Sequence, residues 1–278
     1  MKTTVITADR RRFRLDWKEL WTYRDLILLF TRRNFTVRYK QTILGPLWAL
    51  LYPLISSVFY LVVFGRIAGL GTDGVPQMLF YLSGTAVWSF FAACVTRNAC
   101  LFRDNAAVFG KVYFPRLTVG AANVLSAGMD LAIQLALVLL LTLLCALRGT
   151  VQLTPLRWLL LPLLWVQLGL LGMGCGVLIS GLTTRYRDLA IVVNFGVNLW
   201  MYATPVVYPL STVRDSRLLL LLRLNPVTAP VELFRYCLFG VGQPNWGFYA
   251  LSLLLTLGIL LLGIAVFNRV EKNFIDTI

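Results

Sequence analysis

A basic, aromatic segment joins directly to a long apolar run near the start of this chain, and this join restricts the fold more than any other feature. Residues 32–41 are rich in arginine and aromatic side chains, and the apolar run covers residues 43–64. A segment of the first kind lies flat at a membrane surface. A run of the second kind is long enough to cross the ~30 Å hydrocarbon core as a helix. We therefore expect an amphipathic interface helix over residues 16–42; an ordinary soluble amphipathic helix is the alternative, and the direct join favours the interfacial one.

The composition agrees with a membrane protein. Of 278 residues, 58% are hydrophobic and only 14% are charged, and a soluble domain this apolar would expose large sticky patches. The net charge of +14 could suggest a nucleic-acid partner, but 11 of the 26 basic residues precede residue 43. We interpret them as a collar attracted to anionic membrane lipids, with no nucleic acid involved.

Metal sites and a disulfide framework are not expected. The sequence has no histidine, and its five cysteines are scattered without a C-x-x-C pair, whereas metal and disulfide sites need clustered ligands or regular spacing. Residues 1–42 also lack the order of a cleavable signal peptide. We therefore expect the first span to remain in the mature protein.

Further apolar runs predict an all-α membrane protein with six transmembrane helices. The predicted spans are residues 43–64, 77–100, 117–147, 158–182, 189–207 and 246–267, between a basic tail at 1–15 and a polar tail at 268–278. The third run has 31 residues, about 46 Å as a helix, so it must tilt, bend or protrude. The fourth contains a G-x-x-x-G pattern at 172–176, which is typical of close helix packing in lipid.

The distribution of basic residues predicts the orientation. An even number of spans places both termini on one side, and the loops on that side hold 19 basic residues against 7 on the other. Basic loops stay in the cytoplasm. The sequence therefore predicts a multi-pass protein of the cytoplasmic (inner) membrane with both termini in the cytoplasm.

Two segments between spans do not fit a simple loop. Residues 102–116 are too polar to cross the membrane but are compatible with a short helix that ends at Pro115. Residues 211–246 contain two short apolar pieces separated by Asn225 and Pro226. Short apolar pieces broken by proline are typical of re-entrant helices, so we expect them between spans 5 and 6.

Few residues could carry chemistry inside the membrane. Asp130 is the only acidic residue in the predicted spans, and Gly110-Lys111 is not part of a nucleotide-binding loop. The sequence therefore predicts neither acid–base catalysis nor ATP hydrolysis by this chain. A carboxylate at mid-span is costly unless it faces water or a partner, so Asp130 is either a pathway residue or held by an arginine at an interface, or else a helix-packing aspartate. Asn194 and Asn198 face either a polar passage or another helix.

Several stretches together resemble a known family. They are residues 38–48, 108–116, 185–189, 224–226 and 232–235. In this order they are similar to the membrane subunit of ABC-2 type polysaccharide exporters, the permease family that moves O-antigen, capsular polysaccharide or teichoic acid precursors. The resemblance runs from about Arg24 to the end of the chain, and residues 1–15 lie outside it.

The resemblance implies a homodimer that encloses a channel and is driven by two copies of a separate ATPase subunit, which would hold ATP and Mg; no cofactor is expected on this chain. It implies that the helix after span 2 docks on the ATPase, with a connecting loop as the alternative. The expected coupling residues are Arg103, Asp104, Val108, Phe109, Lys111 and Tyr113. The expected external gate residues are Asn225, Pro226, Glu232 and Arg235.

The implied substrate is a long glycan on a polyprenyl lipid, whose sugars are too polar to cross lipid unaided. Aromatic and polar side chains of a channel could hold the sugars, with lipid-facing or core packing as the alternative. The candidate channel residues are Tyr81, Trp88, Phe91, Asp130, Asn194, Asn198, Trp200 and Tyr202. The basic residues Arg32, Arg33, Arg38 and Lys40 could meet the lipid diphosphate, or only ordinary headgroups of membrane lipids.

Three functions stay open from the sequence. The first is the exporter permease for lipid-linked polysaccharide, and the second is an ABC-2 exporter of a drug or a small lipid. A neighbouring gene for a glycosyltransferase would favour the first. The third is a membrane enzyme of lipid-linked sugar metabolism, which the absent histidines and the single in-span carboxylate disfavour.

Overall fold

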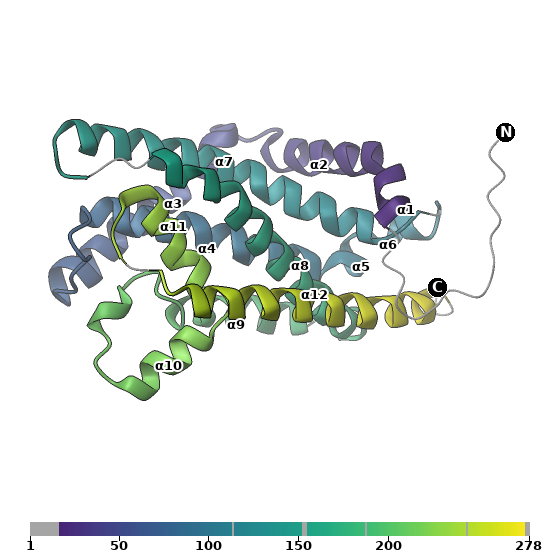
Figure 1. Ribbon diagram of the computed structural model, residues 1–278. Helices are drawn as coiled ribbons and strands as arrows, with labels where there is room; N and C mark the ends of the chain where they lie inside the picture. The colour runs from purple at the N-terminus through teal and green to yellow at the C-terminus, as the bar shows by residue number, and fades with distance from the viewer. Residues whose placement is uncertain (1–16, 113, 152–154, 187, 243, 276–278) are drawn as a thin grey trace.

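The computed structural model describes residues 17–112, 114–151, 155–186, 188–242 and 244–275, and the elements in them are all helical (Figure 1). The basic tail, the predicted helix start at Asp16 and the side chain of Tyr113 lie outside the described residues. The expectation of an all-α protein is confirmed. The elements are α1 (Trp17–Thr22), α2 (Arg24–Tyr39), η1 (Gly45–Leu47), α3 (Trp48–Tyr60), η2 (Leu61–Ile67), α4 (Gln77–Ala99), α5 (Leu101–Asp104), α6 (Ala106–Phe109), α7 (Leu117–Leu147), η3 (Pro155–Leu160), α8 (Leu161–Arg185), α9 (Leu189–Tyr202), η4 (Leu210–Thr212), α10 (Ser216–Leu224), α11 (Thr228–Phe239) and α12 (Trp246–Ile275).

Five helical stretches in the described residues are long and apolar enough to cross a membrane. They are Gly45–Ile67, Gln77–Ala99, Leu117–Leu147, Pro155–Thr184 and Trp246–Arg269. The predicted third span matches α7 at both ends, and the predicted second span differs from α4 by one residue. The last helix continues to Ile275, so the polar tail that we separated from the last span is partly helical.

The fifth predicted span, residues 189–207, is shorter than expected. Helix α9 has 14 residues, about 21 Å at 1.5 Å per residue, which is less than the ~30 Å core. It ends at Tyr202 because residues preceding Pro205 are disfavoured from helical geometry. By length, therefore, the six-span count is not confirmed.

Helix α9 packs along α4. Just before it, the hydroxyl of Thr183 donates to the carbonyl of Ala99 at the end of α4. Just after it, Val206 lies against Gly84 near the start of α4. We call the end where α2 begins the α2 end, and the opposite end, near α10, the α10 end (Figure 1).

The join between α2 and the first span is a sharp turn. Gln41 and Gly45 have φ angles of 64° and 51°, in the left-handed region that glycine adopts freely and other residues rarely. Pro46 then stands at the first positions of the next helix, where its missing N–H is harmless. Through this turn the chain passes from α2 into α3, and both helices contact α7.

Helix α2 lies along α7 and not across the ends of the long helices (Figure 1). The two helices run in the same direction, because Asn34 bonds to Asn123 and Arg38 bonds to Asp130. Phe30 is buried on this contact face. The predicted helix therefore exists, while its expected flat position at the membrane interface is not confirmed.

The core lies around α4. Of the most apolar 18 residues of α4, 78% are buried inside the protein, against 56% or less in the other candidate spans. Helix α8 packs closely on it through glycine: a Cβ on Gly176 would lie 2.5 Å from the carbonyl oxygen of Val95. On its other side, Gly174 faces Gly263 of α12 so closely that a Cβ on Gly263 would lie 2.6 Å from the carbonyl oxygen of Gly174. The packing role predicted for the glycine pattern is confirmed.

An aromatic cluster joins the elements that meet at the α2 end. It contains Phe30 of α2, Phe102 of α5, Phe109 of α6, Phe114, and Phe267 of α12. The rings of Phe102 and Phe267 stack with centroids 4.6 Å apart, and Phe30 lies 5.6 Å from Phe114. The start of α2 and the later part of α12 are therefore at the same end of the bundle.

Two short helices occupy the segment where we expected re-entrant helices. Helix α10 has 9 residues and α11 has 12, with Asn225 and Pro226 between them. Most of α11 is buried against the long helices, whereas α10 lies at the outside of the bundle (Figure 1). Their existence is confirmed, and their position in a membrane stays a prediction.

Candidate functional site

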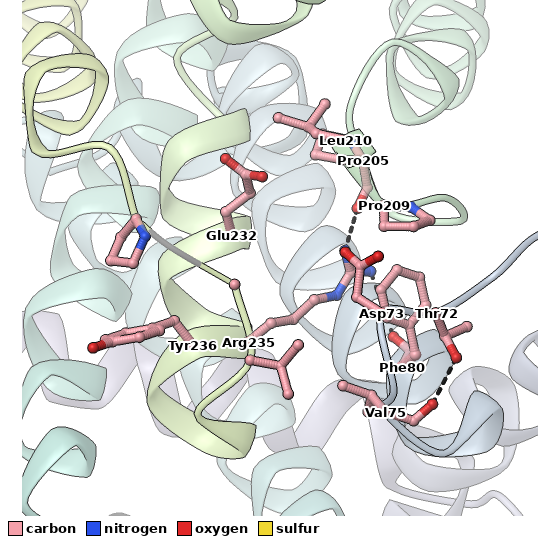
Figure 2. Close-up of a pocket in the computed structure, with 13 residues that line it drawn as sticks. Thr72, Asp73, Val75, Phe80, Pro205, Pro209, Leu210, Glu232, Arg235 and Tyr236 are labelled. Atoms are coloured by element: carbon pink, nitrogen blue, oxygen red, sulfur yellow. Dashed lines mark hydrogen bonds between the residues drawn. The ribbon is translucent and has the colours of Figure 1, made fainter. Parts of the chain in front are cut away.

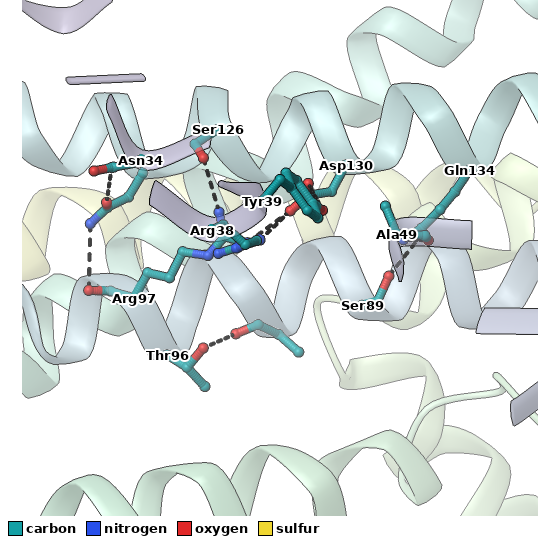
Figure 3. Close-up of polar contacts among 12 residues, drawn as sticks. Asn34, Arg38, Tyr39, Ala49, Ser89, Thr96, Arg97, Ser126, Asp130 and Gln134 are labelled. Atoms are coloured by element: carbon teal, nitrogen blue, oxygen red, sulfur yellow. Dashed lines mark hydrogen bonds and ion pairs between the residues drawn. The ribbon is translucent and has the colours of Figure 1, made fainter. Parts of the chain in front are cut away.

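A cluster of charged side chains lies where α2, α4 and α7 meet (Figure 3). Asp130 of α7 forms hydrogen-bonded ion pairs with Arg38 of α2 and with Arg97 of α4. Nη2 of Arg97 lies 2.9 Å from the carboxylate. Tyr39 donates its hydroxyl to the other carboxylate oxygen at 2.8 Å. The side chains of Asp130 and Arg97 are only 14% and 18% exposed. The carboxylate that we noted in the sequence is thus held by two arginines from two other helices.

Three features of the local sequence bring these groups together. Arg38 and Tyr39 form the last turn of α2, which reaches Asp130 because α2 lies along α7. Arg97 is two residues from the end of α4, and its Nη1 also donates to Ser126, 3.4 Å away, one turn before Asp130. A long arginine side chain can extend from a buried helix to a carboxylate near its end.

The hydroxyl of Tyr39 stays protonated at neutral pH. Burial, and then the hydrogen bond to Asp130, raise the pKa of Tyr39 to about 12, because both the low-dielectric surroundings and the adjacent carboxylate disfavour a phenolate. Tyr39 therefore acts as a donor that fixes one oxygen of Asp130, while the other oxygen faces the two guanidinium groups.

These charged groups form one wall of a cavity of about 400 Å³. The rest of the wall is largely aromatic and apolar. The lining residues are Arg38, Tyr39, Trp48, Ala49, Tyr52, Pro53, Ser89, Phe90, Ala93, Arg97, Ala127, Asp130, Leu131 and Gln134. A cavity with apolar walls and a few convergent polar groups is the usual form of a ligand site, and its size is within the ~300–1,000 Å³ typical of such sites.

A second group of polar contacts forms another part of the cavity wall. Gln134 of α7 donates to the carbonyl of Ala49 in α3 and accepts from the hydroxyl of Ser89 in α4, both at 3.0 Å (Figure 3). The hydrogen-bonding groups of Gln134 thus have partners on both α3 and α4, and these bonds fix the three helices around the cavity.

A smaller pocket of about 50 Å³ lies at the α10 end (Figure 2). Arg235 of α11 is buried there and donates to the carbonyls of Pro205 and Val206, with its guanidinium 3.6 Å above the ring of Phe80. Asp73 and Glu232 line the same pocket. Arg235 thereby provides donors for two backbone carbonyls in the segment that follows α9.

Asn225 makes a second connection at this end. Its side chain donates to Ala203 and Thr204, both at 2.9 Å, and accepts from the indole of Trp200 at 3.2 Å. The predicted gate residues Asn225 and Arg235 therefore both tie the α10–α11 pair to the end of α9. Whether this region opens and closes stays a prediction.

Comparison with known proteins decides the family. Residues 25–239 match the model of the ABC-2 type transporter family. The chain belongs to this family.

Curated relatives cover most of the chain. It is 24% and 26% identical to two O-antigen export system permease proteins RfbA of Klebsiella pneumoniae, over 91% of this chain and 94% of each relative. It is 28% identical to the RfbA permease of Myxococcus xanthus, over 76% of this chain and 79% of the relative. Together with its apolar helices, this makes the chain a multi-pass membrane protein and a transport subunit.

In this ABC-2 protein, the candidate coupling segment is two four-residue helices, α5 and α6, and not one helix. Arg103, Asp104 and Lys111 are exposed, and Val112 is 60% exposed. Phe109, in contrast, is 8% exposed and belongs to the aromatic cluster. We therefore assign Phe109 to packing. The coupling role of Arg103, Asp104, Lys111 and the half-buried Val108 stays a prediction, and Val112 is an exposed neighbour that we had not included.

Three of the candidate channel residues belong to the core of the chain. Tyr81, Trp88 and Phe91 of α4 are between 0% and 4% exposed. The rings of Trp88 and Phe91 pack on Trp200, with centroids 6.4 and 5.2 Å away. Our assignment of these three residues to a channel wall needs correction, because buried rings cannot touch a passing sugar without repacking the core.

Four of the five remaining channel candidates of this transporter belong to α9, where Asn194, Asn198 and Tyr202 share one face, and the fifth, Asp130, belongs to α7. Asn194, Asn198 and Tyr202 are exposed, and Trp200 is half-buried. Among the basic candidates, Arg32 and Lys40 are exposed, and Arg33 bonds to Asn105 at 3.1 Å. Arg38 and Asp130, which we had placed in different groups, come together in the structure, as do Trp200 and Asn225.

Arg97 is the residue that sequence reasoning missed. We counted it only as a basic residue on the cytoplasmic side, because it stands near the end of an apolar run. It is 33 residues from Asp130 along the chain, so no local spacing connects the two. The available signal was the presence of a lone in-span carboxylate, which is costly unless it faces water or a partner such as an arginine.

Proposed function

We propose that this chain is the membrane subunit of an ATP-driven exporter that moves lipid-linked polysaccharide, of the O-antigen, capsule or teichoic acid type, across the cytoplasmic membrane. The observation that carries the proposal is the match over residues 25–239 together with relatives named O-antigen export permeases over up to 91% of the chain. A transport role also agrees with the cavity, which combines charged and aromatic walls where α2, α3, α4 and α7 meet.

The working unit is a homodimer. Helix α9 presents an exposed face that carries Ile191, Phe195 and Leu199 together with Asn194 and Asn198. Exposed amides on an apolar helix are costly against lipid. This face is therefore better suited to a second copy or to a water-filled passage between two copies than to hydrocarbon.

Energy comes from two copies of a separate ATPase subunit that holds ATP and Mg. The exposed residues of α5, α6 and the following turn provide a surface for it, with Arg103, Asp104, Lys111 and Val112 available for contact. The aromatic cluster beneath them connects this surface to α2, α7 and α12. A push on the coupling segment would thus reach α2, whose last turn borders the cavity.

The α2 end faces the cytoplasm in this proposal. The start of α2 and the later part of α12 lie at this end, as the contact of Phe102 with Phe267 indicates. The excess of basic residues in the loops that we assign to this side agrees with the rule that basic loops remain inside. Both termini are then cytoplasmic, and α10 and α11 lie toward the outer face.

Deletion of the gene in its source organism tests the function. We expect lipid-linked glycan to accumulate inside the cells and to disappear from the surface, with rescue by the wild-type gene. Cells that retain normal surface glycan but lose resistance to a drug, or efflux of a small lipid, would contradict the polysaccharide assignment and support the second ABC-2 function. Glycan turnover by the purified chain without any ATPase would contradict both.

A further inference from the structure

The charged cluster has an excess of positive charge beside the cavity. Arg38 and Arg97 share the single carboxylate of Asp130, so the three groups carry a formal charge of +1. Each guanidinium has five N–H donors, and the contacts to Asp130 and Ser126 use only part of them. Two cations held side by side, with donors to spare, are suited to an anion.

We propose that Arg38 and Arg97 bind the phosphate group of a lipid-linked substrate, and that Asp130 is the internal counter-ion that keeps the two arginines in place when the site is empty. The proposal rests on the proposed function, and it names the part of the substrate that the cavity recognises. Guanidinium groups form paired hydrogen bonds to phosphate oxygens, which a lysine cannot match in geometry.

The walls of the cavity select what is attached to the phosphate. Trp48, Tyr52 and Phe90 provide aromatic surfaces beside the arginines. Such surfaces accommodate an isoprenoid chain or the apolar face of a sugar ring. The volume of about 400 Å³ leaves room for a diphosphate and the first groups bonded to it. Trp48 and Tyr52 are themselves 49% and 71% exposed, so the cavity opens toward the side where a lipid chain would lie.

Asp130 can remain in place when an anion binds. Tyr39 holds one of its oxygens by a hydrogen bond of 2.8 Å, and this bond does not depend on the arginines. In the empty site the carboxylate prevents mutual repulsion of Arg38 and Arg97. In the occupied site the bound phosphate takes over part of this role, and the negative charge of Asp130 limits the affinity so that the substrate can be released.

A binding assay with a matched pair of probes tests the proposal. The full chain in lipid nanodiscs would be titrated with farnesyl diphosphate and with farnesol, which differ only in the diphosphate. We expect the diphosphate probe to bind more tightly than the alcohol, and Arg97→Gln and Arg38→Gln each to weaken diphosphate binding by about tenfold or more. Asp130→Asn should tighten it several-fold, because the amide still accepts a hydrogen bond but carries no negative charge.

Controls separate the proposal from general effects. Arg24→Gln removes the same charge from an exposed position on α2, where Arg24 pairs only weakly with Asp25 at 3.9 Å, and should leave both probes unaffected. Arg97→Lys keeps the charge but loses the paired geometry, and should fall between wild type and Arg97→Gln. Farnesol binding should be the same in all variants, which shows that the cavity is still folded.

Three results would overturn the proposal. The first is diphosphate affinity in Arg97→Gln equal to that of wild type. The second is a loss in Asp130→Asn as large as in Arg97→Gln, which would make Asp130 part of the fold and not a counter-ion. The third is phosphatidylglycerol or inorganic diphosphate competing as well as farnesyl diphosphate, which would indicate an ordinary headgroup or a free-anion site. Rescue of the deletion strain by the wild-type gene would still support the proposed function in each case.

Discussion

Arg97 on α4 and Asp130 on α7 form an ion pair, with Nη2 of the arginine 2.9 Å from Oδ2 of the aspartate. Both side chains are largely buried. Removing one member of such a pair leaves a charge without a partner, which costs much more than the pair itself contributes. The pair explains how a 31-residue apolar helix tolerates a carboxylate near its middle.

Asp130→Leu should therefore destabilise the protein by roughly 2 kcal/mol, less than for a fully buried pair because Arg38 is partly exposed. The two arginines would then face one another without a counter-ion. Thermal unfolding of the purified chain in detergent measures the change. Asp25→Leu serves as the control, because the side chain of Asp25 is 89% exposed; equal stability losses in the two variants would contradict the role of Asp130.

The coupling surface is tested at Val112, which is 60% exposed. We expect Val112→Asp to fold normally but to lose co-purification with the ATPase subunit, because it places a charge on an exposed apolar contact position. Phe109→Asp should instead lower the amount of folded protein, since Phe109 is buried in the aromatic cluster. Arg148→Asp, at the opposite end of α7, is the control; unchanged ATPase binding by Val112→Asp would show that the subunit docks elsewhere.

The contact between α4 and α8 depends on Gly176. A Cβ there would lie 2.5 Å from the carbonyl oxygen of Val95 and 2.6 Å from Cβ of Asn98. Gly176→Leu should cost about 3 kcal/mol or more, because overpacking displaces backbone as well as side chains. Gly258→Leu in α12 is a matched control, since no atom lies within 4 Å of its added Cβ. Similar melting temperatures for the two variants would rule out the close approach.

Arg235 should hold the α10 end together. Arg235→Leu would leave the carbonyls of Pro205 and Val206 without donors and remove the stack on Phe80, with an expected cost of about 2–4 kcal/mol. Limited proteolysis of the segment between α9 and α11 measures local loosening. Arg217→Leu on the exposed α10 should leave the cleavage pattern unchanged, and identical patterns for both variants would contradict the pinning role.

Much of the architecture follows from the order of apolar runs and breakers along the chain. Residues 117–147 form one helix with both ends as predicted, because nothing in that run interrupts helical hydrogen bonding. The two short helices on either side of Asn225 also follow from length and proline placement. The first span ends three residues later than predicted because its last turns widen into a π-helix, which a hydropathy pattern does not encode.

The order and composition of the residues were therefore enough to predict the all-helical membrane class, the family resemblance, and the constraint that Asp130 must face water or a partner. The position of α2 along α7, the pairing of Asp130 with Arg38 and Arg97, and the burial of Tyr81, Trp88 and Phe91 could be seen only in the folded chain. Periodicity and composition indicate which segments are helical and which face of each helix is apolar. They do not indicate which helix packs against that face, because this depends on contacts between segments that are far apart in the chain.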